Sequence, residues 1–293
     1  MASPADLRTR AQSAAAALPA LVLSAERLAA MIAPGAHGLR RGGAGEDFWQ
    51  YRPAGQGDTA RSIDWRRSAR SDQQFVRDRE AQTAQAVQIW VSAGRGMDFA
   101  GSGSGPRDER PTKRERAQVL GLALAMLLLR GGEKVALAGS PPRAGRVQGD
   151  RIAEALALQP LVEDDDDIPP AQSLRPNQRV ILLGDFLGDV DPLTDYIAQA
   201  AAMGVRGAAL QVLDPDEEVF PFAGAVLFQS ATGRMRHDTR DAGGLRDAYL
   251  SRLAERRALL TDTARAAGWH FGTHDTATPP ASALMWLYRM LEG

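Results

Sequence analysis

The regular alternation of short apolar segments with longer amphipathic ones after residue 85 constrains the fold most. We expect strands at residues 86–93, 133–139, 179–183, 207–213 and 269–273. We expect helices at residues 113–130, 152–158, 192–203, 245–267 and 279–291, and a small β-hairpin over residues 225–229 and 233–237. Strands that alternate with helices form a mostly parallel sheet with helices on both faces. The predicted fold is therefore α/β.

Ligands of such sheets bind at the carboxyl ends of the strands. The predicted strand ends carry Ser92–Asp98, Gly184–Asp189, Asp214–Asp216 and Thr273–Asp275. Asp185 directly follows an apolar strand, and it could hold a divalent cation if further oxygen ligands converge on it. The candidates for those ligands are Ser92, Asp98, Asp214 and Asp275. Aspartates at these positions also cap helices and solvate loops, which is the alternative interpretation.

No local motif predicts a catalytic centre. Gly94-Arg95-Gly96 lacks the third glycine of a dinucleotide fingerprint, and the glycines and serines of residues 101–105 do not form a nucleophile elbow. The chain has no cysteine, which removes thiolate catalysis, and its four histidines show no zinc-binding spacing. We therefore expect no enzymatic activity and no cofactor.

The overall composition indicates a protein of the cytoplasm. No apolar run reaches the roughly 20 residues of a membrane span, and residues 119–129 fit a buried helix better. The absence of cysteine favours a reducing compartment. Residues 4–17 and 21–32 are predicted to be helical, with Ser24 as an N-cap. The acidic run at residues 163–167 is predicted to be a solvated loop.

The segment Gly42–Glu80 interleaves glycines, aromatic residues, acids and arginines. We interpret it as an irregular segment in which arginines bond to acids and the tryptophans Trp49 and Trp65 hold the network. Arginines beside aromatic residues could instead bind phosphate or nucleic acid. However, the acids nearly cancel the arginine charge, and the formal net charge of the chain is −1. Nucleic-acid binding is therefore a third hypothesis and not the leading one.

The same segment resembles the domain of unknown function 58 family. The matching elements are a glycine-rich entry, an acid–aromatic pair, Tyr51-Arg52-Pro53, Gly57-Asp58, Arg61 and Ile63-Asp64-Trp65, followed by Ala69-Arg70 and an acid. The residues expected to form the signature network are Glu46, Arg52, Asp58, Arg61, Asp64, Trp65, Arg70 and Glu80.

The resemblance implies a von Willebrand factor A-like domain, which we place at residues 85–293. It also implies that residues 35–84 pack on this domain, after an N-terminal helical segment at residues 1–34. Family members are similar to components of bacterial systems that pair with a MoxR-type AAA+ ATPase. The leading hypothesis is therefore a non-enzymatic interaction module that works with such an ATPase in protein assembly or maturation.

The metal motif of von Willebrand A-type folds is degenerate in this chain. That motif begins with D-x-S-x-S after the first strand, and the matching positions are Ser92, Gly94 and Gly96. Asp185 and Ser92 are the remaining metal-ligand candidates, so we expect no bound metal. A metal-dependent binder or enzyme that uses acids around Asp185 is the alternative hypothesis. The candidate interaction surface at the strand ends consists of Ser92, Gly94, Gly96, Asp98 and Asp185.

Overall fold

The computed structural model describes residues 19–31, 39–55, 58–59, 63–69, 73–101, 110–162, 167–229 and 236–291, without the side chains of residues 39–50, 52, 77–83, 173, 229 and 236. Several predicted features lie outside the described residues. They are the helix at residues 4–17, the two arginines Arg61 and Arg70, and the side chains of Glu46, Arg52 and Glu80. The chain divides into two compact units. The first comprises Met1–Gly35 and Ala86–Gly293, and the second comprises Ala36–Gln85.

The first unit is built on a five-stranded sheet in the order β4-β3-β5-β6-β9. These strands are β3 (Ala86–Val91), β4 (Lys134–Leu137), β5 (Arg179–Gly184), β6 (Arg206–Leu213) and β9 (His270–Asp275). Every neighbouring pair is parallel. Strands covered on both faces need apolar residues at nearly every position, as in the buried run Val180–Leu183 of β5. The predicted α/β architecture is confirmed.

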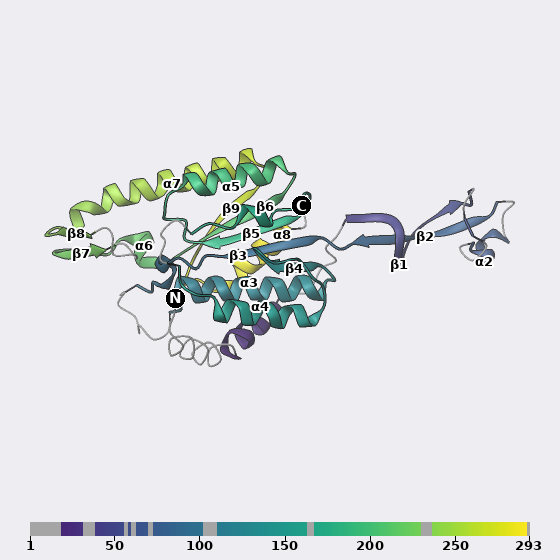
Figure 1. Cartoon of the computed structure of the whole chain (residues 1–293), viewed down its shortest axis with the longest axis horizontal. Helices are drawn as coiled ribbons and strands as arrows, with labels where there is room; N and C mark the ends of the chain where they lie inside the picture. The colour runs from purple at the N-terminus through teal and green to yellow at the C-terminus, as the bar shows by residue number, and fades with distance from the viewer. Residues whose placement is uncertain are drawn as a thin grey trace. The chain divides into compact units, whose positions relative to one another are not determined.

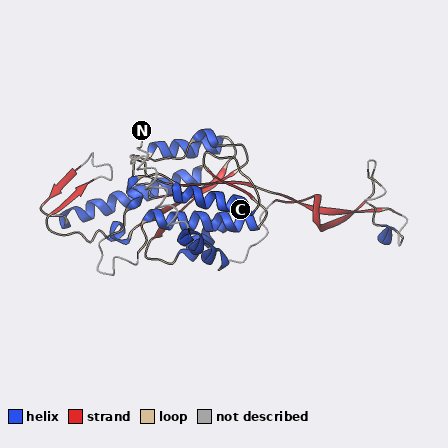
Figure 2. Cartoon of the chain, turned by 60° about the horizontal axis from the view of Figure 1, so that its bottom comes forward, coloured by secondary structure: helices blue, strands red, loops and turns tan. Residues whose placement is uncertain are grey.

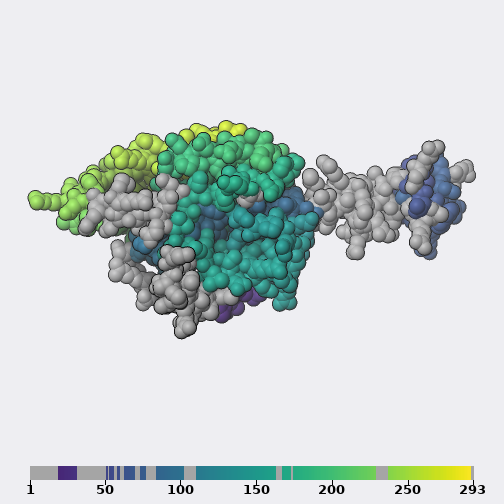
Figure 3. All heavy atoms as spheres, viewed as in Figure 1, coloured from purple at the N-terminus to yellow at the C-terminus, as the bar shows by residue number. Residues whose placement is uncertain are grey.

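Helices cover both faces of this sheet (Figures 1 and 2). One face carries residues 19–30, α3 (Lys113–Arg130), α4 (Arg146–Leu158) and α8 (Pro280–Met290), which share one buried apolar cluster with it. The opposite face carries α5 (Asp191–Ala202) and α7 (Arg246–Ala266), which pack on a second cluster. In the space-filling view, the atoms of residues 113–158, coloured teal, lie side by side on the visible face of the first unit (Figure 3).

Several short elements complete the first unit. The antiparallel hairpin β7 (Val226–Gln229) and β8 (Arg236–Thr239) confirms the predicted hairpin, although its connection lies outside the described residues. The remaining elements are α6 (Pro215–Val219) and the 3-10 helices η1 (Arg95–Asp98), η2 (Ala171–Ser173) and η3 (Gly243–Leu245). No helix in the described ranges is both long and apolar enough to cross a bilayer.

Two predicted helix starts are wrong. α4 begins at Arg146 and not at residue 152, because it starts after Gly145, a left-handed glycine whose φ is 91°, without any side-chain cap. Ser24 lies inside the helix of residues 19–30 and does not cap it. The apolar residues Leu21 and Val22 pack against the core, so the helix extends further toward the N-terminus than the cap pattern suggested.

The second unit is a long antiparallel ladder of β1 (Leu39–Pro53) and β2 (Phe75–Thr83), with the short helix α2 (Trp65–Ser68) between them. The expectation of an irregular segment is therefore wrong. Aromatic residues favour strands, and the glycine-rich stretch coincides with a register shift between Gly43 and Phe48.

Two predicted network residues, Asp64 and Trp65, lie at the start of α2. The Asp64 carboxylate accepts hydrogen bonds from the Arg67 backbone N–H at 3.0 Å and from the Tyr51 hydroxyl at 3.2 Å. Trp65, which we expected to hold the network, is 57% exposed. Because Asp64 is the N-cap, Trp65 occupies the first helical position. In addition, the Arg67 guanidinium lies 4.3 Å from the centroid of the Tyr51 ring.

Candidate functional site

A cleft of about 960 Å³ opens at the carboxyl ends of β3, β5 and β6. Its lining comes from the segments after β3 and β5, from the first turns of α3 and α6, and from β7 and α7. All the residues of the predicted interaction surface line it, namely Ser92, Gly94, Gly96, Asp98 and Asp185. Asp214 and Asp275, which were candidates to join Asp185, do not line it.

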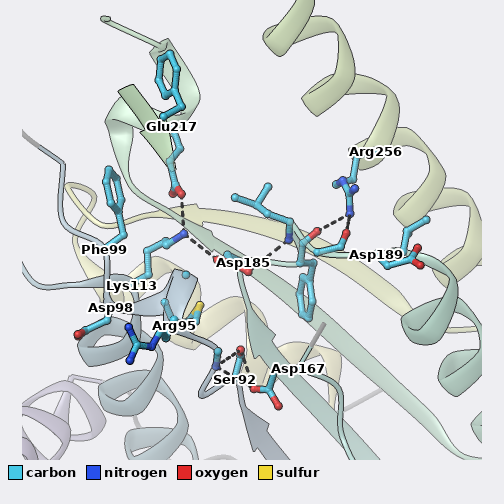
Figure 4. A pocket seen from close by; sticks show the side chains of 18 of the residues that line it. Ser92, Arg95, Asp98, Phe99, Lys113, Asp167, Asp185, Asp189, Glu217 and Arg256 are labelled. Carbon is cyan, nitrogen blue, oxygen red and sulfur yellow. Dashed lines mark hydrogen bonds and ion pairs between the residues drawn. The ribbon is translucent and has the colours of Figure 1, made fainter. Parts of the chain in front are cut away.

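The ammonium group of Lys113 lies in the centre of the site (Figure 4). Its Nζ atom is 2.8 Å from Oδ2 of Asp185 and 2.6 Å from Oε1 of Glu217. Lys113 is only 1% exposed, although it lines the cleft. Its Nζ also lies 5.7 Å from the centroid of the Phe99 ring. One buried cation therefore joins two carboxylates that are far apart in the sequence.

Capping boxes at the N-termini of α3 and α6 position Lys113 and Glu217. Thr112 and Glu115 form a capping box, so α3 begins at Lys113. Asp214 and Glu217 form a second capping box at α6, in which Oε2 of Glu217 accepts the Asp214 N–H at 2.9 Å. The other carboxylate oxygen of Glu217 is thereby directed at Lys113.

The electrostatics of this trio keep the lysine charged. Burial alone would lower the pKa of Lys113, but the attraction of Asp185 and Glu217 outweighs it and raises that pKa above its ordinary value. Burial raises the pKa of Glu217, and the attraction of Lys113 only partly opposes that shift.

A second acid binds the segment after β3. Oδ2 of Asp167 accepts hydrogen bonds from the Ser92 hydroxyl at 3.0 Å and from the N–H groups of Ala93 and Gly94 at 2.6 and 3.1 Å. The expectation that the acidic run is a solvated loop is therefore wrong for Asp167, while residues 163–166 lie outside the described residues. The Val162 N–H also donates to the Ala93 carbonyl, so backbone pairing brings the loop to this place.

With Lys113 in place, the residues at these positions do not suit a divalent ion. Gly94 and Gly96 offer no side-chain oxygen, the Ser92 hydroxyl is engaged with Asp167, and Asp185 is paired with Lys113. A Cβ atom at position 96 would lie 3.0 Å from Oδ2 of Asp185, so a serine there would crowd the ion pair. Within the described residues, no group of three or more histidines and acids is placed to hold a metal.

The outer part of the cleft is apolar and aromatic. Phe220 contacts Phe222, Phe228 and Tyr249, with ring centroids 5.1, 5.5 and 4.8 Å away. The Arg256 side chain of α7 donates to the carbonyl of Phe186 at 3.1 Å and also to that of Gly188. These bonds fix the loop after β5, where Phe186 has a left-handed backbone with φ of 49°.

A separate polar cluster lies at the ends of β6 and β9 and is internal. Arg116 Nη1 lies 3.0 Å from His274 Nε2, and its Nη2 donates to the Thr276 carbonyl at 2.8 Å. The Thr276 hydroxyl donates to Oδ2 of Asp214 at 3.2 Å. Burial, followed by repulsion from Arg116, lowers the pKa of His274 to about 4. This cluster joins two strand ends and has a structural role.

Lys113, Asp167 and Glu217, which pair with the predicted residues of the cleft or with each other, were not predicted. One sequence signal could have identified Lys113. It lies in the first turn of a helix, where the helix dipole disfavours a cation, so a nearby acid would stabilise it there. Asp167 and Glu217 carry no comparable local signal, because their partners are 75 and 104 residues away.

Comparisons with known proteins agree with the sequence resemblance. The sequence model described as "Protein of unknown function DUF58" matches residues 50–259. The uncharacterized protein Rv1480 of Mycobacterium tuberculosis is 27% identical over 273 residues, which cover 87% of this chain and 82% of the relative. The uncharacterized protein Mb1516 of Mycobacterium bovis matches with the same values.

Solved structures show more distant similarity. A structure of an aerotolerance-related membrane protein from Bacteroides fragilis has a TM-score of 0.44 and 16% identity, and the match covers 71% of this chain and 98% of that one. The conserved hypothetical protein BatB from Bacteroides thetaiotaomicron has a TM-score of 0.38 and 14% identity, with coverage of 71% and 97%.

Proposed function

Because the chain belongs to the DUF58 family of proteins of unknown function, we propose that it is a non-enzymatic protein-interaction module with a von Willebrand A-like fold. In this proposal it works with a MoxR-type AAA+ ATPase in the assembly or maturation of other proteins. The observation that carries the proposal is the cleft at the strand ends. Its charged groups form ion pairs and hydrogen bonds with one another, and aromatic side chains line its outer part.

The chemistry of the cleft supports binding over catalysis. Lys113 is held between two carboxylates, so it is not available as a base or a nucleophile. The Ser92 hydroxyl bonds to a carboxylate, and no histidine that could activate it is among the described lining residues.

The rim of the cleft supports a protein ligand. Leu227 of the β7 strand is 47% exposed and lines the cleft beside Phe222 and Phe228. Aromatic and apolar side chains gathered around a cavity are typical of the centres of protein interfaces. The nearby hairpin β7–β8 adds antiparallel backbone to the same rim.

The proposal is tested by titrating the purified protein with the purified MoxR-type ATPase of the same organism, with and without ATP, in a calorimeter. Leu227→Ala should weaken binding at least tenfold, because the substitution removes an apolar contact of about 1.4 kcal/mol or more. Leu259→Ala is the matched control, because Leu259 is also 47% exposed but does not line the cleft. No binding in any nucleotide state, or equal weakening by both substitutions, would argue against the proposal.

A further inference from the structure

Lys113 is among the most completely buried large side chains of the described residues, although it carries a full charge. Moving an ammonium group out of water is costly unless it is paired and hydrogen-bonded. Its place in the first turn of α3 adds repulsion from the helix dipole. Such a residue needs strong compensation at its head group, and the structure provides it from two carboxylates.

The two carboxylates come from different strand ends and converge on one point. Asp185 follows β5, and Glu217 lies in α6, which follows β6. The side chains of Asp185 and Glu217 are themselves 16% and 15% exposed. Two carboxylates that meet at the end of a parallel sheet would repel each other unless a cation lies between them. The Lys113 Nζ atom lies at that position (Figure 4).

We propose that Asp185 and Glu217 form a cation-binding site whose resident cation is the ammonium group of Lys113. The lysine is a covalently attached replacement for a divalent ion. The nearby glycines are consistent with this replacement, because a side chain at position 96 would crowd the Asp185 carboxylate that accepts from Lys113. Because the cation is part of the chain, the site is always occupied, and ligand binding in the cleft does not depend on divalent ions.

The replacement also explains why the Ser92 hydroxyl bonds to Asp167 and does not take part in the site around Lys113. With an ammonium in place, the site needs two acceptors and not the six or more oxygens of a hard divalent cation. The Ser92 hydroxyl is then available to donate to Asp167, and that second acid fixes the segment after β3. The inference concerns the cation alone, so it stands or fails separately from the proposed ATPase partner.

The first experiment uses the wild-type protein and paramagnetic Mn²⁺ as the probe. The ammonium resonance of Lys113 in lysine-labelled protein should be protected from solvent exchange and should not broaden as Mn²⁺ is added. The exposed Lys134 in β4 supplies the reference signal for non-specific broadening. Selective broadening or loss of the Lys113 signal at low Mn²⁺ concentration would show that a metal displaces the lysine and would overturn the proposal.

The second experiment removes the resident cation. The Lys113→Ala variant should bind Mn²⁺ at least tenfold more tightly than the wild-type protein in calorimetry, and Mn²⁺ should raise its melting temperature. The double substitution Lys113→Ala with Asp185→Asn should abolish the gain. Equal Mn²⁺ binding by wild-type and Lys113→Ala proteins, or a folded Lys113→Ala protein without any gain, would overturn the proposal. If Lys113→Ala does not fold, the wild-type resonance experiment still decides.

Discussion

Burying the ammonium of Lys113 has a cost that its two carboxylate partners offset. Lys113→Met keeps an unbranched side chain of similar length but removes the charge, so Asp185 and Glu217 are left close together without their cation. Removing one partner of a buried ion pair costs about 3–5 kcal/mol. We expect a loss of that size in the free energy of unfolding, measured by urea denaturation.

The control for this substitution is Lys134→Met. Lys134 is an exposed lysine of the edge strand β4, and its replacement should change the free energy of unfolding by no more than about 0.5 kcal/mol. A similar effect of both substitutions would show that the Lys113 trio contributes no more stability than a surface charge.

His274 gives the first unit a specific pH dependence. Its pKa is lowered from 6.5 to about 4 in the folded chain, because burial and then Arg116 disfavour the imidazolium. Between these pH values the unfolded chain binds more protons at this residue than the folded chain, so the contribution of His274 to stability rises from pH 4 to pH 6.5. The shift corresponds to at most about 3 kcal/mol.

The measurement is the free energy of unfolding at pH values between 4 and 7. His274→Gln keeps a neutral acceptor near Arg116 and should flatten the curve in that window. His270→Gln, at an exposed position of the same strand, should leave the slope unchanged. A wild-type slope that survives in His274→Gln would assign the acid sensitivity to other groups.

The chemistry of individual residues was only partly predictable. Asp185 and Ser92 were identified because they directly follow apolar strands, which fixes their place at one edge of a parallel sheet. Sequence order alone could not show that Ser92 bonds to Asp167 and that Asp185 bonds to Lys113. These pairings span 75 and 72 residues, so they depend on how loops from different strands meet.

Among the secondary-structure elements, those with local start and stop signals were predicted best. The bounds of α3 match the prediction, because Thr112 and Glu115 form a capping box and Gly131 follows the last turn. α4 has no side-chain cap, and its first turns were therefore missed. The pairing of β1 with β2 was also missed, because bulges and charged residues obscure the period-two pattern of its strands.

Two glycines in different elements should respond to alanine with opposite signs. A Cβ atom at Gly207 in β6 would lie 2.3 Å from the Val180 carbonyl oxygen and 2.8 Å from the Trp269 ring, so Gly207→Ala must separate packed groups. We expect a loss of about 2–3 kcal/mol, as for other overpacked cores. At Gly149 in α4, the nearest atom would be Leu129 Cδ1 at an ordinary 3.6 Å. Gly149→Ala should therefore stabilise the helix by about 0.5–1 kcal/mol.

Thermal and urea unfolding of the two variants tests this pair of expectations. The comparison is informative because both substitutions add the same methyl group. If Gly207→Ala had the same urea midpoint of unfolding as the wild-type protein, the packing of β6 against β5 and Trp269 would have to be looser than the distances indicate.

Both buried apolar clusters of the described residues lie in the α/β unit. The described part of the second unit consists of a two-stranded ladder and one short helix. Isolated two-stranded hairpins are at best marginally stable in water. We therefore expect residues 35–84 to need another surface for their stability, and their packing on residues 85–293 stays a prediction.

Amide hydrogen exchange can test that prediction. If the segment packs on the α/β unit, backbone amides of β1 and β2 should exchange at least tenfold more slowly in the full chain than in a peptide of residues 36–85, because docking suppresses local opening. The amides of the central strand β5 provide the fully protected reference. Equal exchange of β1 and β2 in both samples would mean that the segment gains its stability elsewhere.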